Sequence, residues 1–393
     1  MTEKLYYQSP YQKTFSAHVV RCTPVGQHYA VVLDRTAFYP EGGGQPCDTG
    51  VLDFINILDV QERDGEIVHT TDAPATPGSV VTGGINWDRR FRLMQQHTGE
   101  HLVSGIAHRL FQVDNVGFHM GEKFLTVDWN GRLDSLQLAT VERLANEAVF
   151  RNLPVQAAFL SNEQLKAVVY RSKKELQGPV RIVTIPGYDV CACCGTHVAA
   201  TGEVGPVKIL TSQSYKGGTR ITMACGAQAM DDYREKADGA AFLSGLLSAK
   251  PEEISQAAER LLHENTDLKR ELSDRKAVIF ELKAAALTET SKMVCLFENG
   301  LSADDMRRFA TIVASKRGVT AAVLCGDDEN GYRYAVASLR QDVRPLGKAM
   351  NAAFSGRGGG SAELVQGSVR GQAEGIREFF AQNPQKLHES QKG

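Results

Sequence analysis

Two short segments, far apart in the sequence, each carry residues that bind transition metals. The first segment, QQHTGEH, contains His97 and His101, and the second, CCGTH, begins at Cys193 and ends at His197. His97 and His101 are four residues apart, so on a helix both imidazoles project from the same face. With Cys193 and His197 they provide three nitrogens and one sulfur, enough to complete a tetrahedral zinc site. The sequence therefore predicts one Zn2+ per chain and a fold in which a helix meets a cysteine-bearing loop.

Two alternatives remain open at this metal site. Cys191 and Cys194 compete with Cys193 for the sulfur position. A shell closed by four protein ligands is typical of structural zinc, so catalysis would require a ligand to yield, the coordination to expand, or the metal to hold substrate. HTGEH also matches the H-x-x-E-H pattern of inverted metalloproteases, in which Glu100 would be the general base. That hypothesis needs a third, acidic ligand downstream, and the sequence singles none out.

Composition limits the class of protein. The chain has 393 residues, of which 42% are hydrophobic and 23% charged, and this predicts two to four ordinary globular domains. Its 44 basic and 46 acidic residues give a net charge of −2, so nucleic-acid contacts must come from local patches. Eight cysteines in so long a chain form no disulfide framework. The sequence shows neither a signal-like start nor an apolar run of membrane-spanning length, which predicts a cytoplasmic protein without a membrane partner.

The periodicity of apolar residues predicts an α+β multidomain fold. Short β-branched runs from Phe15 to Ile85 predict a small β-barrel or sheet, and three- and four-residue spacing predicts a helix from Arg92 to Phe111. We expect four domains: a β-rich domain with a glycine motif (1–86), an α+β zinc-containing domain (87–238), a helical coiled-coil arm (239–290) and a small α/β C-terminal module with a Gly-rich loop (291–393).

Within the zinc-containing domain, residues 118–129 alternate like one strand and residues 140–149 are periodic like a helix. Residues 180–187 predict a strand that ends in a turn, and residues 207–210 predict a last strand. The cysteine segment is therefore expected on a loop between strands.

The arm is predicted from a change in composition after Gly239. Residues 251–253, Pro-Glu-Glu, favour a helix start, and apolar residues from Ile254 to Leu282 alternate at four and three residues, as in a coiled coil or helical hairpin. Such an arm could pair two chains as a homodimer. In the C-terminal module, the Gly-rich segment 354–361 predicts a loop whose amides could face an anion, or a set of tight turns.

Three ordered motifs resemble a known family. They are LDRTAFYPEGGGQP at 33–46, the His97/His101 pair, and CCGTHV at 193–198 followed by TGEVG at 201–205. Together they are similar to the alanyl-tRNA editing proteins called AlaX, freestanding relatives of the editing region of alanyl-tRNA synthetase. The arm and C-terminal module resemble the long form of that family. The family pattern has glycine where this chain has Cys194, and the register favours Cys193 as the ligand.

The resemblance implies a zinc-dependent aminoacyl-tRNA deacylase that edits in trans, so the zinc-containing domain would be an editing domain. Its partner would be tRNA(Ala) mischarged with serine, with glycine as an alternative, and alanine would be spared. A site that hydrogen-bonds a hydroxyl strongly rejects the analogue lacking it, which makes this selectivity physically sound. The alternative from another class is a nonenzymatic tRNA-binding protein in which zinc is structural.

The resemblance also suggests roles for individual residues. Thr36 would recognise the serine hydroxyl, Gln45 would orient the terminal adenosine or a water, and Asn115 would be a polar group beside the site. Gly42, Gly43 and Gly44 would let the backbone approach substrate, or form a turn. Further expectations are Asp189 orienting a ligand imidazole, His119 as a polar neighbour, and phosphate contacts by Arg89, Arg90, Arg92, Lys173, Lys174, Lys216 and Arg220. The C-terminal module would touch the outer body of the tRNA or pair two subunits.

Overall fold

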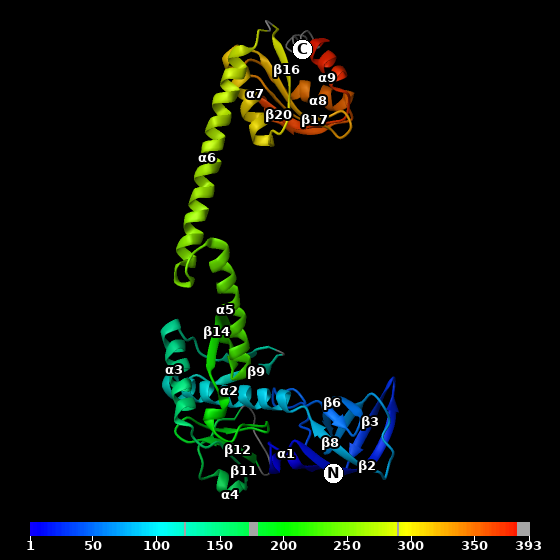
Figure 1. Ribbon diagram of the computed structural model, residues 1–393, viewed down its shortest axis with the longest axis vertical. Helices are drawn as coiled ribbons and strands as arrows, with labels where there is room; N and C mark the ends of the chain where they lie inside the picture. The colour runs from blue at the N-terminus through cyan, green and yellow to red at the C-terminus, as the bar shows by residue number, and fades with distance from the viewer. Residues whose placement is uncertain (122, 173–179, 289–290, 383–393) are drawn as a thin grey trace. The chain divides into compact units, whose positions relative to one another are not determined.

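The computed structural model describes residues 1–121, 123–172, 180–288 and 291–382 (Figure 1). The chain divides into two compact units, residues 1–242 and 243–393, and each is described by itself. The predicted mixture of helices and β-sheets in several structural parts is confirmed. The four predicted domain boundaries stay a prediction. In the described part of the chain, no helix combines the length and the apolar character needed to cross a membrane.

The first unit begins with a closed β-barrel, one of the two predicted forms of this region. Along β2, buried Phe15, Ala17 and Val19 alternate with exposed residues, so the apolar side chains fill the interior. The barrel order is β2 (Thr14–Val25), β3 (His28–Leu33), β7 (Glu66–Thr71), β6 (Ile55–Arg63), β5 (Gly50–Leu52) and β8 (Val80–Ile85). Beside it, β1 (Glu3–Lys4) pairs in parallel with β4 (Arg35–Thr36), and α1 (Leu5–Gln8) follows β1.

The central element of this unit is α2 (Trp87–Phe111), which adjoins the barrel in Figure 1. Its first turn is capped by Asn86, whose side chain accepts a hydrogen bond from the amide of Arg89 at 3.2 Å. Every residue from Leu93 to Ala107 is buried. Because a helix buried on all sides must satisfy its polar side chains internally, the histidines and glutamines of α2 require protein partners.

Two further sheets and the helices that connect their strands lie around α2 in the first unit. The four-stranded sheet has the order β14 (Val207–Tyr215), β15 (Gly218–Cys225), β10 (Leu125–Trp129) and β9 (Asn115–Met120), and the three-stranded sheet has the order β11 (Gln156–Leu160), β12 (Val180–Ile185) and β13 (Asp189–Ala192). The connecting helices are α3 (Ser135–Arg151), α4 (Asn162–Leu165) and the 3-10 helix η1 (Thr201–Val204).

One strand prediction in this region is wrong. Residues 118–129 form no single strand but fall in the antiparallel pair β9 and β10, with Met120 opposite Leu125. The amide of Gly121 donates to the carbonyl of Phe124 at 2.9 Å, next to the facing ends of the two strands. Apolar residues are spaced by two on both sides of the break, at 118 and 120 and again at 125, 127 and 129, and this concealed the break in the sequence. Strand β13, just before the cysteine segment, was also not predicted.

The second unit begins within α5 (Ala227–Leu247) and continues through the 3-10 helix η2 (Pro251–Glu253) into α6 (Ile254–Ala286). The apolar seam predicted for the arm lies on α6, where Leu261, Leu268 and Leu272 are exposed. Near the end of α6, Phe280 is buried and stacks on Phe309 of the next helix with ring centroids 4.7 Å apart. The coiled coil itself stays a prediction.

The rest of the second unit is an α/β module. Its sheet has the order β16 (Met293–Glu298), β17 (Thr320–Asp327), β18 (Gly331–Ala337), β20 (Leu364–Val369) and β19 (Arg357–Gly360), with α7 (Ala303–Arg317), α8 (Arg344–Ala353) and α9 (Ala373–Gln382). The predicted Gly-rich loop is therefore partly an edge strand. Gly358 and Gly367 pair directly across β19 and β20, and a side chain on either would collide with the opposite backbone.

Candidate metal centre

The four predicted ligands come together in the first unit. His97 and His101 project from α2, whereas Cys193 and His197 lie on the loop after β13. Their ligand atoms all lie within 4.8 Å of one another. The Sγ of Cys193 is 3.3 Å from Nε2 of His97 and 3.7 Å from Nε2 of His197. The three imidazoles are buried and Cys193 is half-buried, so Cys193 is the most exposed residue of the four.

The ring of His97 is oriented by Gln45, which comes from the glycine motif. The Gln45 Oε1 atom lies 2.8 Å from His97 Nδ1 and 3.1 Å from the amide nitrogen of Thr196. A backbone amide can only donate, so this end of the Gln45 side chain must be the oxygen, and Nδ1 of His97 must carry the proton. The Nε2 lone pair is then free to bind a metal. The other end of the Gln45 amide donates to Thr196 Oγ1 at 2.9 Å.

The ring of His101 is oriented in the same way by a carboxylate. Asp189 Oδ2 lies 2.7 Å from His101 Nδ1, and Arg171 binds both Asp189 oxygens at 2.7 and 2.8 Å. Burial would raise the pKa of Asp189, but the hydrogen bonds from His101 and Arg171 lower it below its usual value. The carboxylate therefore stays charged and holds the Nδ1–H tautomer of His101, leaving Nε2 directed at the cluster. The expectation that Asp189 orients a ligand imidazole agrees with this geometry.

The charges of the cluster suit a divalent cation. Burial would raise the pKa of Cys193, but His97, His197 and His101 together bring it well below its usual value, which favours the thiolate. Burial lowers the pKa of His197 to about 3, so this ring is neutral. Burial also opposes charge on His101, yet Asp189 and Cys193 raise its pKa well above the usual value. A thiolate, neutral imidazole and a strong local preference for positive charge are the features of a zinc site.

Glycines allow the cysteine loop and the Gln45 turn to pack closely around His97. An added side chain at Gly195 would collide with the imidazole of His97 and would lie 2.9 Å from Gln45 Oε1. Gly42 and Gln45 exchange two backbone hydrogen bonds of 3.0 Å, closing a tight turn in which Gly43 and Gly44 have φ of +61° and +82°. Within the described residues these glycines therefore serve a turn, the second of the two predicted roles. Contact of their backbone with substrate stays a prediction.

Comparisons with known proteins identify the family. Residues 5–89 match the family model for tRNA synthetases class II (A), residues 180–222 match the threonyl and alanyl tRNA synthetase second additional domain, and residues 289–387 match the DHHA1 domain. The alanine–tRNA ligase of Pyrococcus abyssi is 32% identical over 399 residues, covering 94% of this chain and 42% of the ligase. That of Halobacterium salinarum is 37% identical over 303 residues, covering 72% of this chain and 32% of the ligase. The chain belongs to the alanyl-tRNA synthetase-related family.

Membership of this family supports a function related to alanyl-tRNA. The chain spans less than half the length of the ligases it matches, so their complete activity does not transfer to it. Cys193 and His197 lie within the matched second additional domain, and Gln45 lies within the matched class II region. The cluster of four donors thus joins residues from a matched segment to His97 and His101, which lie outside all three matched ranges.

Within this alanyl-tRNA synthetase relative, the structure gives Thr36 two internal hydrogen bonds. Its Oγ1 lies 2.9 Å from Nε2 of His69 and accepts from the amide of Phe38 at 3.1 Å. Both Thr36 and His69 are fully buried. Recognition of a substrate hydroxyl by Thr36 would therefore require it to exchange one of these partners.

Asn115 and Glu100 also form an internal network. The Asn115 amide donates to the Glu100 carboxylate and to Ser104 Oγ at 3.3 Å, and Ser104 donates to Glu100 Oε1 at 2.6 Å. Asn115 is thus bound to the α2 carboxylate, whereas a contact with substrate stays a prediction. A metalloprotease would need the Glu100 carboxylate for water, and this network argues against that alternative. His119 is exposed on β9.

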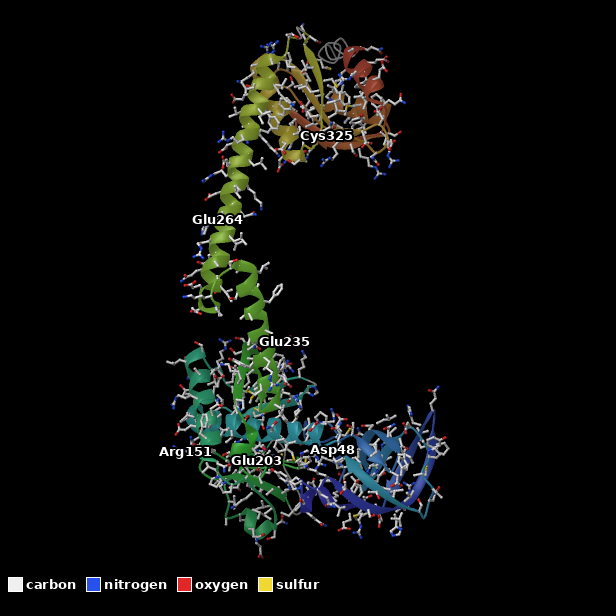
Figure 2. All side chains as sticks on the ribbon, in the orientation of Figure 1. Asp48, Arg151, Glu203, Glu235, Glu264 and Cys325 are labelled. Atoms are coloured by element: carbon white, nitrogen blue, oxygen red, sulfur yellow. The ribbon has the colours of Figure 1, made fainter. Side chains whose placement is uncertain are left out.

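One predicted phosphate contact is wrong. Arg90 is fully buried and forms an ion pair with the equally buried Asp48, which Figure 2 labels beside the barrel. Its guanidinium also donates to the carbonyls of Ala37 at 2.6 Å and Pro10 at 2.8 Å. It therefore cannot reach a phosphate at the surface. The sequence offered no sign of this burial, because the run Arg89, Arg90 and Arg92 resembles a solvated basic patch.

The other predicted phosphate contacts differ in whether their side chains already have a protein partner. Arg92 pairs with Asp231 at 2.6 Å, and Arg220 pairs with Asp128 at 2.5 Å. The half-buried Arg89 donates to the carbonyl of Cys47 at 3.1 Å, and Lys216 is exposed. Lys173 and Lys174 lie outside the described residues. Contact of any of these side chains with tRNA stays a prediction.

Three functional neighbours were missed by the sequence reasoning. Arg171 holds Asp189, Thr196 binds Gln45, and Arg181 donates to the carbonyls of Cys193 at 3.0 Å and Gly195 at 2.9 Å. Arg171 and Arg181 carry no motif, and their positions arise from strand pairing: Arg171 bridges to β13, and Arg181 lies on β12. Thr196 lies inside the CCGTH motif, between Cys193 and His197, and this position was the one available signal.

Proposed function

We propose that this chain is a zinc-dependent trans-editing deacylase. Its substrate is Ser-tRNA(Ala), with Gly-tRNA(Ala) as an alternative, and its reaction is hydrolysis of the aminoacyl ester. The observation that carries the proposal is the cluster of four donor atoms within 4.8 Å, in a member of the alanyl-tRNA synthetase-related family. The matched second additional domain contributes two of the four donors.

His97, His101, Cys193 and His197 would hold one Zn2+. When bound, the ion supplies positive charge that polarises an ester carbonyl or lowers the pKa of water. Gln45 and Asp189 are positioning residues, because they fix the tautomer and orientation of the two α2 imidazoles. The ester is already activated relative to an amide, so the site mainly needs to orient its reactants and stabilise the oxyanion.

Substrate would approach on the side of Cys193. This is the half-buried member of the cluster, and the three imidazoles are at most 4% exposed. Selection of serine over alanine would use a hydroxyl partner, for which Thr36 is the candidate. A site that loses a hydrogen bond with the alanyl ester would discriminate against it strongly.

Deacylation of charged tRNA tests the proposal directly. The purified chain is incubated with tRNA(Ala) carrying labelled serine, and release of serine is compared with release of alanine from Ala-tRNA(Ala). We expect serine release with the alanyl ester intact. Equal hydrolysis of both esters would contradict the proposed specificity. If neither ester is hydrolysed, the proposed function is wrong.

Paired variants test the metal assignment. His101→Ala is compared with His108→Ala on the same helix, and Cys193→Ala with Cys194→Ala. We expect the His101 and Cys193 variants to lose zinc and activity together, whereas the matched controls retain both. Zinc content is measured by atomic emission spectroscopy. A Cys194→Ala variant that loses zinc while Cys193→Ala keeps it would move the sulfur ligand to Cys194.

The same experiment separates the enzyme from a tRNA-binding protein with structural zinc. Zinc is removed with a chelator, and circular dichroism, tRNA affinity and deacylation are measured on the same sample. Loss of turnover with preserved fold and tRNA affinity supports the deacylase. A zinc-free protein that unfolds, together with a zinc-loaded protein that binds tRNA without hydrolysis, would establish the structural alternative.

We also propose that the arm pairs two chains. The support is the seam on α6, where Leu261, Leu268, Leu272 and Leu282 are between 55% and 65% exposed. Analytical ultracentrifugation of the wild type and of Leu268→Glu tests it. A monomeric wild type would contradict the dimer.

A further inference from the structure

An aromatic surface lies beside the metal-binding loop and is not used by the proposed chemistry. It consists of the rings of Tyr7 in α1 and Phe159 in β11, and we call it the aromatic shelf. The two ring centroids are 5.3 Å apart with an interplanar angle of 81°. Tyr7 is half-buried and Phe159 is 54% exposed, so the shelf presents an aromatic face to solvent. Exposed rings held in a fixed geometry are suited to stacking.

Arg181 connects the shelf to the metal loop. It stands directly across from Phe159 in the pairing of β11 with β12, and its guanidinium carbon lies 5.2 Å from the centroid of Tyr7. Its Nη1 donates to the carbonyls of Cys193 and Gly195 at 3.0 and 2.9 Å. The shelf is therefore linked through Arg181 to the loop that carries Cys193.

The charge of Arg181 indicates the class of ligand. The residue is 8% exposed, and among the described residues it binds two carbonyls and lies over Tyr7, with no carboxylate paired to it. A guanidinium without a carboxylate partner adds a positive field to this surface and favours an anionic ligand. An apolar protein segment would cover the rings but bring no anion into that field. A nucleotide provides both a flat base for the rings and a phosphate for the field of Arg181.

We propose that the aromatic shelf stacks the unpaired 3′-terminal base of the tRNA and thereby places the terminal ribose ester beside Cys193. The inference rests on the proposed function, since it names the binding surface for the end of the same substrate. Stacking recognises the π face that every base has, so it adds affinity without selecting the amino acid. It acts equally on the ground state and the transition state, and its loss raises KM and leaves kcat unchanged.

The test replaces the terminal adenine of uncharged tRNA(Ala) with 2-aminopurine, whose fluorescence falls when it stacks. The full-length zinc-loaded protein is titrated in as wild type, Phe159→Leu, Phe159→Trp and Phe150→Leu. Phe150, on α3, is 88% exposed and serves as the matched control. We expect quenching with the wild type, Phe159→Trp and Phe150→Leu, and loss of quenching with Phe159→Leu. For Ser-tRNA(Ala), Phe159→Leu should raise KM about five- to 150-fold, the range for one stacked base.

The outcomes separate this proposal from the function on which it rests. Bound tRNA whose 2-aminopurine is not quenched by the wild type overturns the shelf, even where serine is released normally. Equal quenching by Phe159→Leu and wild type also overturns it. Quenching that depends on Phe159 in a protein without deacylase activity supports the shelf and overturns the proposed function. Thermal unfolding of each variant identifies any loss of fold.

Discussion

Replacing Gln45 with leucine should weaken both the metal site and the fold. The fully buried Gln45 side chain makes three hydrogen bonds, to His97 Nδ1 at 2.8 Å, to the amide of Thr196 at 3.1 Å and to its hydroxyl at 2.9 Å. A buried polar group that loses its partner costs about 1–3 kcal/mol. With partial relaxation of the three groups, we expect the free energy of unfolding to fall by about 3–5 kcal/mol.

The expected loss of zinc affinity has a separate cause. Leucine leaves the Nδ1–H of His97 without an acceptor, so neither the tautomer nor the ring angle is fixed. Loss of such a supporting partner typically lowers metal affinity about 10- to 100-fold. Gln45→Glu should retain most of the affinity, because a carboxylate still accepts from His97 and from the Thr196 amide. The order of zinc affinity is therefore expected to be wild type, Gln45→Glu, then Gln45→Leu.

Zinc affinity is measured by competition with a chromophoric chelator, and stability by urea unfolding of the metal-free protein. Gln61→Leu is the matched control, since Gln61 binds Glu41 outside the cluster at 3.0 Å. It should change neither quantity. If Gln45→Leu binds zinc as tightly as the wild type, the orientation argument for His97 is refuted, whatever happens to stability.

Three further predictions concern other parts of the first unit. Burial lowers the pKa of His69 to about 4 from an unfolded value of 6.5, so the unfolded state binds the extra proton and His69 should lower stability by about 3 kcal/mol as pH drops from 6.5 to 4; in urea unfolding, the fall should be smaller by that amount in His69→Gln. Arg90→Met should lower the free energy of unfolding by about 3–5 kcal/mol, because it leaves Asp48 as an unpaired buried carboxylate; a value below 1 kcal/mol would contradict the buried pair. Gly195→Ala should reduce zinc content in the purified protein, because the new methyl group would occupy the position of the His97 ring, and normal loading would show that the loop relaxes without harm.

The sequence predicted the four clustered donor residues because their geometry is largely local. His97 and His101 share a helix face through a spacing of four residues, and Cys193 and His197 share one short loop. We predicted that the two segments come together because one cation would need ligands from both. The barrel was predictable for a similar reason, since its short β-branched strands alternate with turn residues.

The supporting residues were not predictable in the same way. Gln45 was expected to orient the terminal adenosine or a water, whereas its partners in the structure are His97 and Thr196, which are 52 and 151 residues away in sequence. Arg181 reaches the cysteine loop only because β12 lies between β11 and β13. A single side chain in such a network carries no periodicity and no motif. Its role depends on how elements pack, and local patterns do not encode that packing.

The buried Arg90 helps to hold the loop that places Gln45 beside His97. The segment from Tyr39 to Asp48 is a closed loop, because the amide of Asp48 donates to the carbonyl of Tyr39 at 3.0 Å and the Asp48 carboxylate accepts from the amide of Tyr39 at 2.6 Å. Arg90 holds that carboxylate, and Arg90 is on the same helix as His97. The helix α2 therefore fixes the base of the loop through Arg90 and receives the tip of the loop, Gln45, at His97. An arginine placed in a basic run by sequence is, in the folded protein, part of the support of the metal centre.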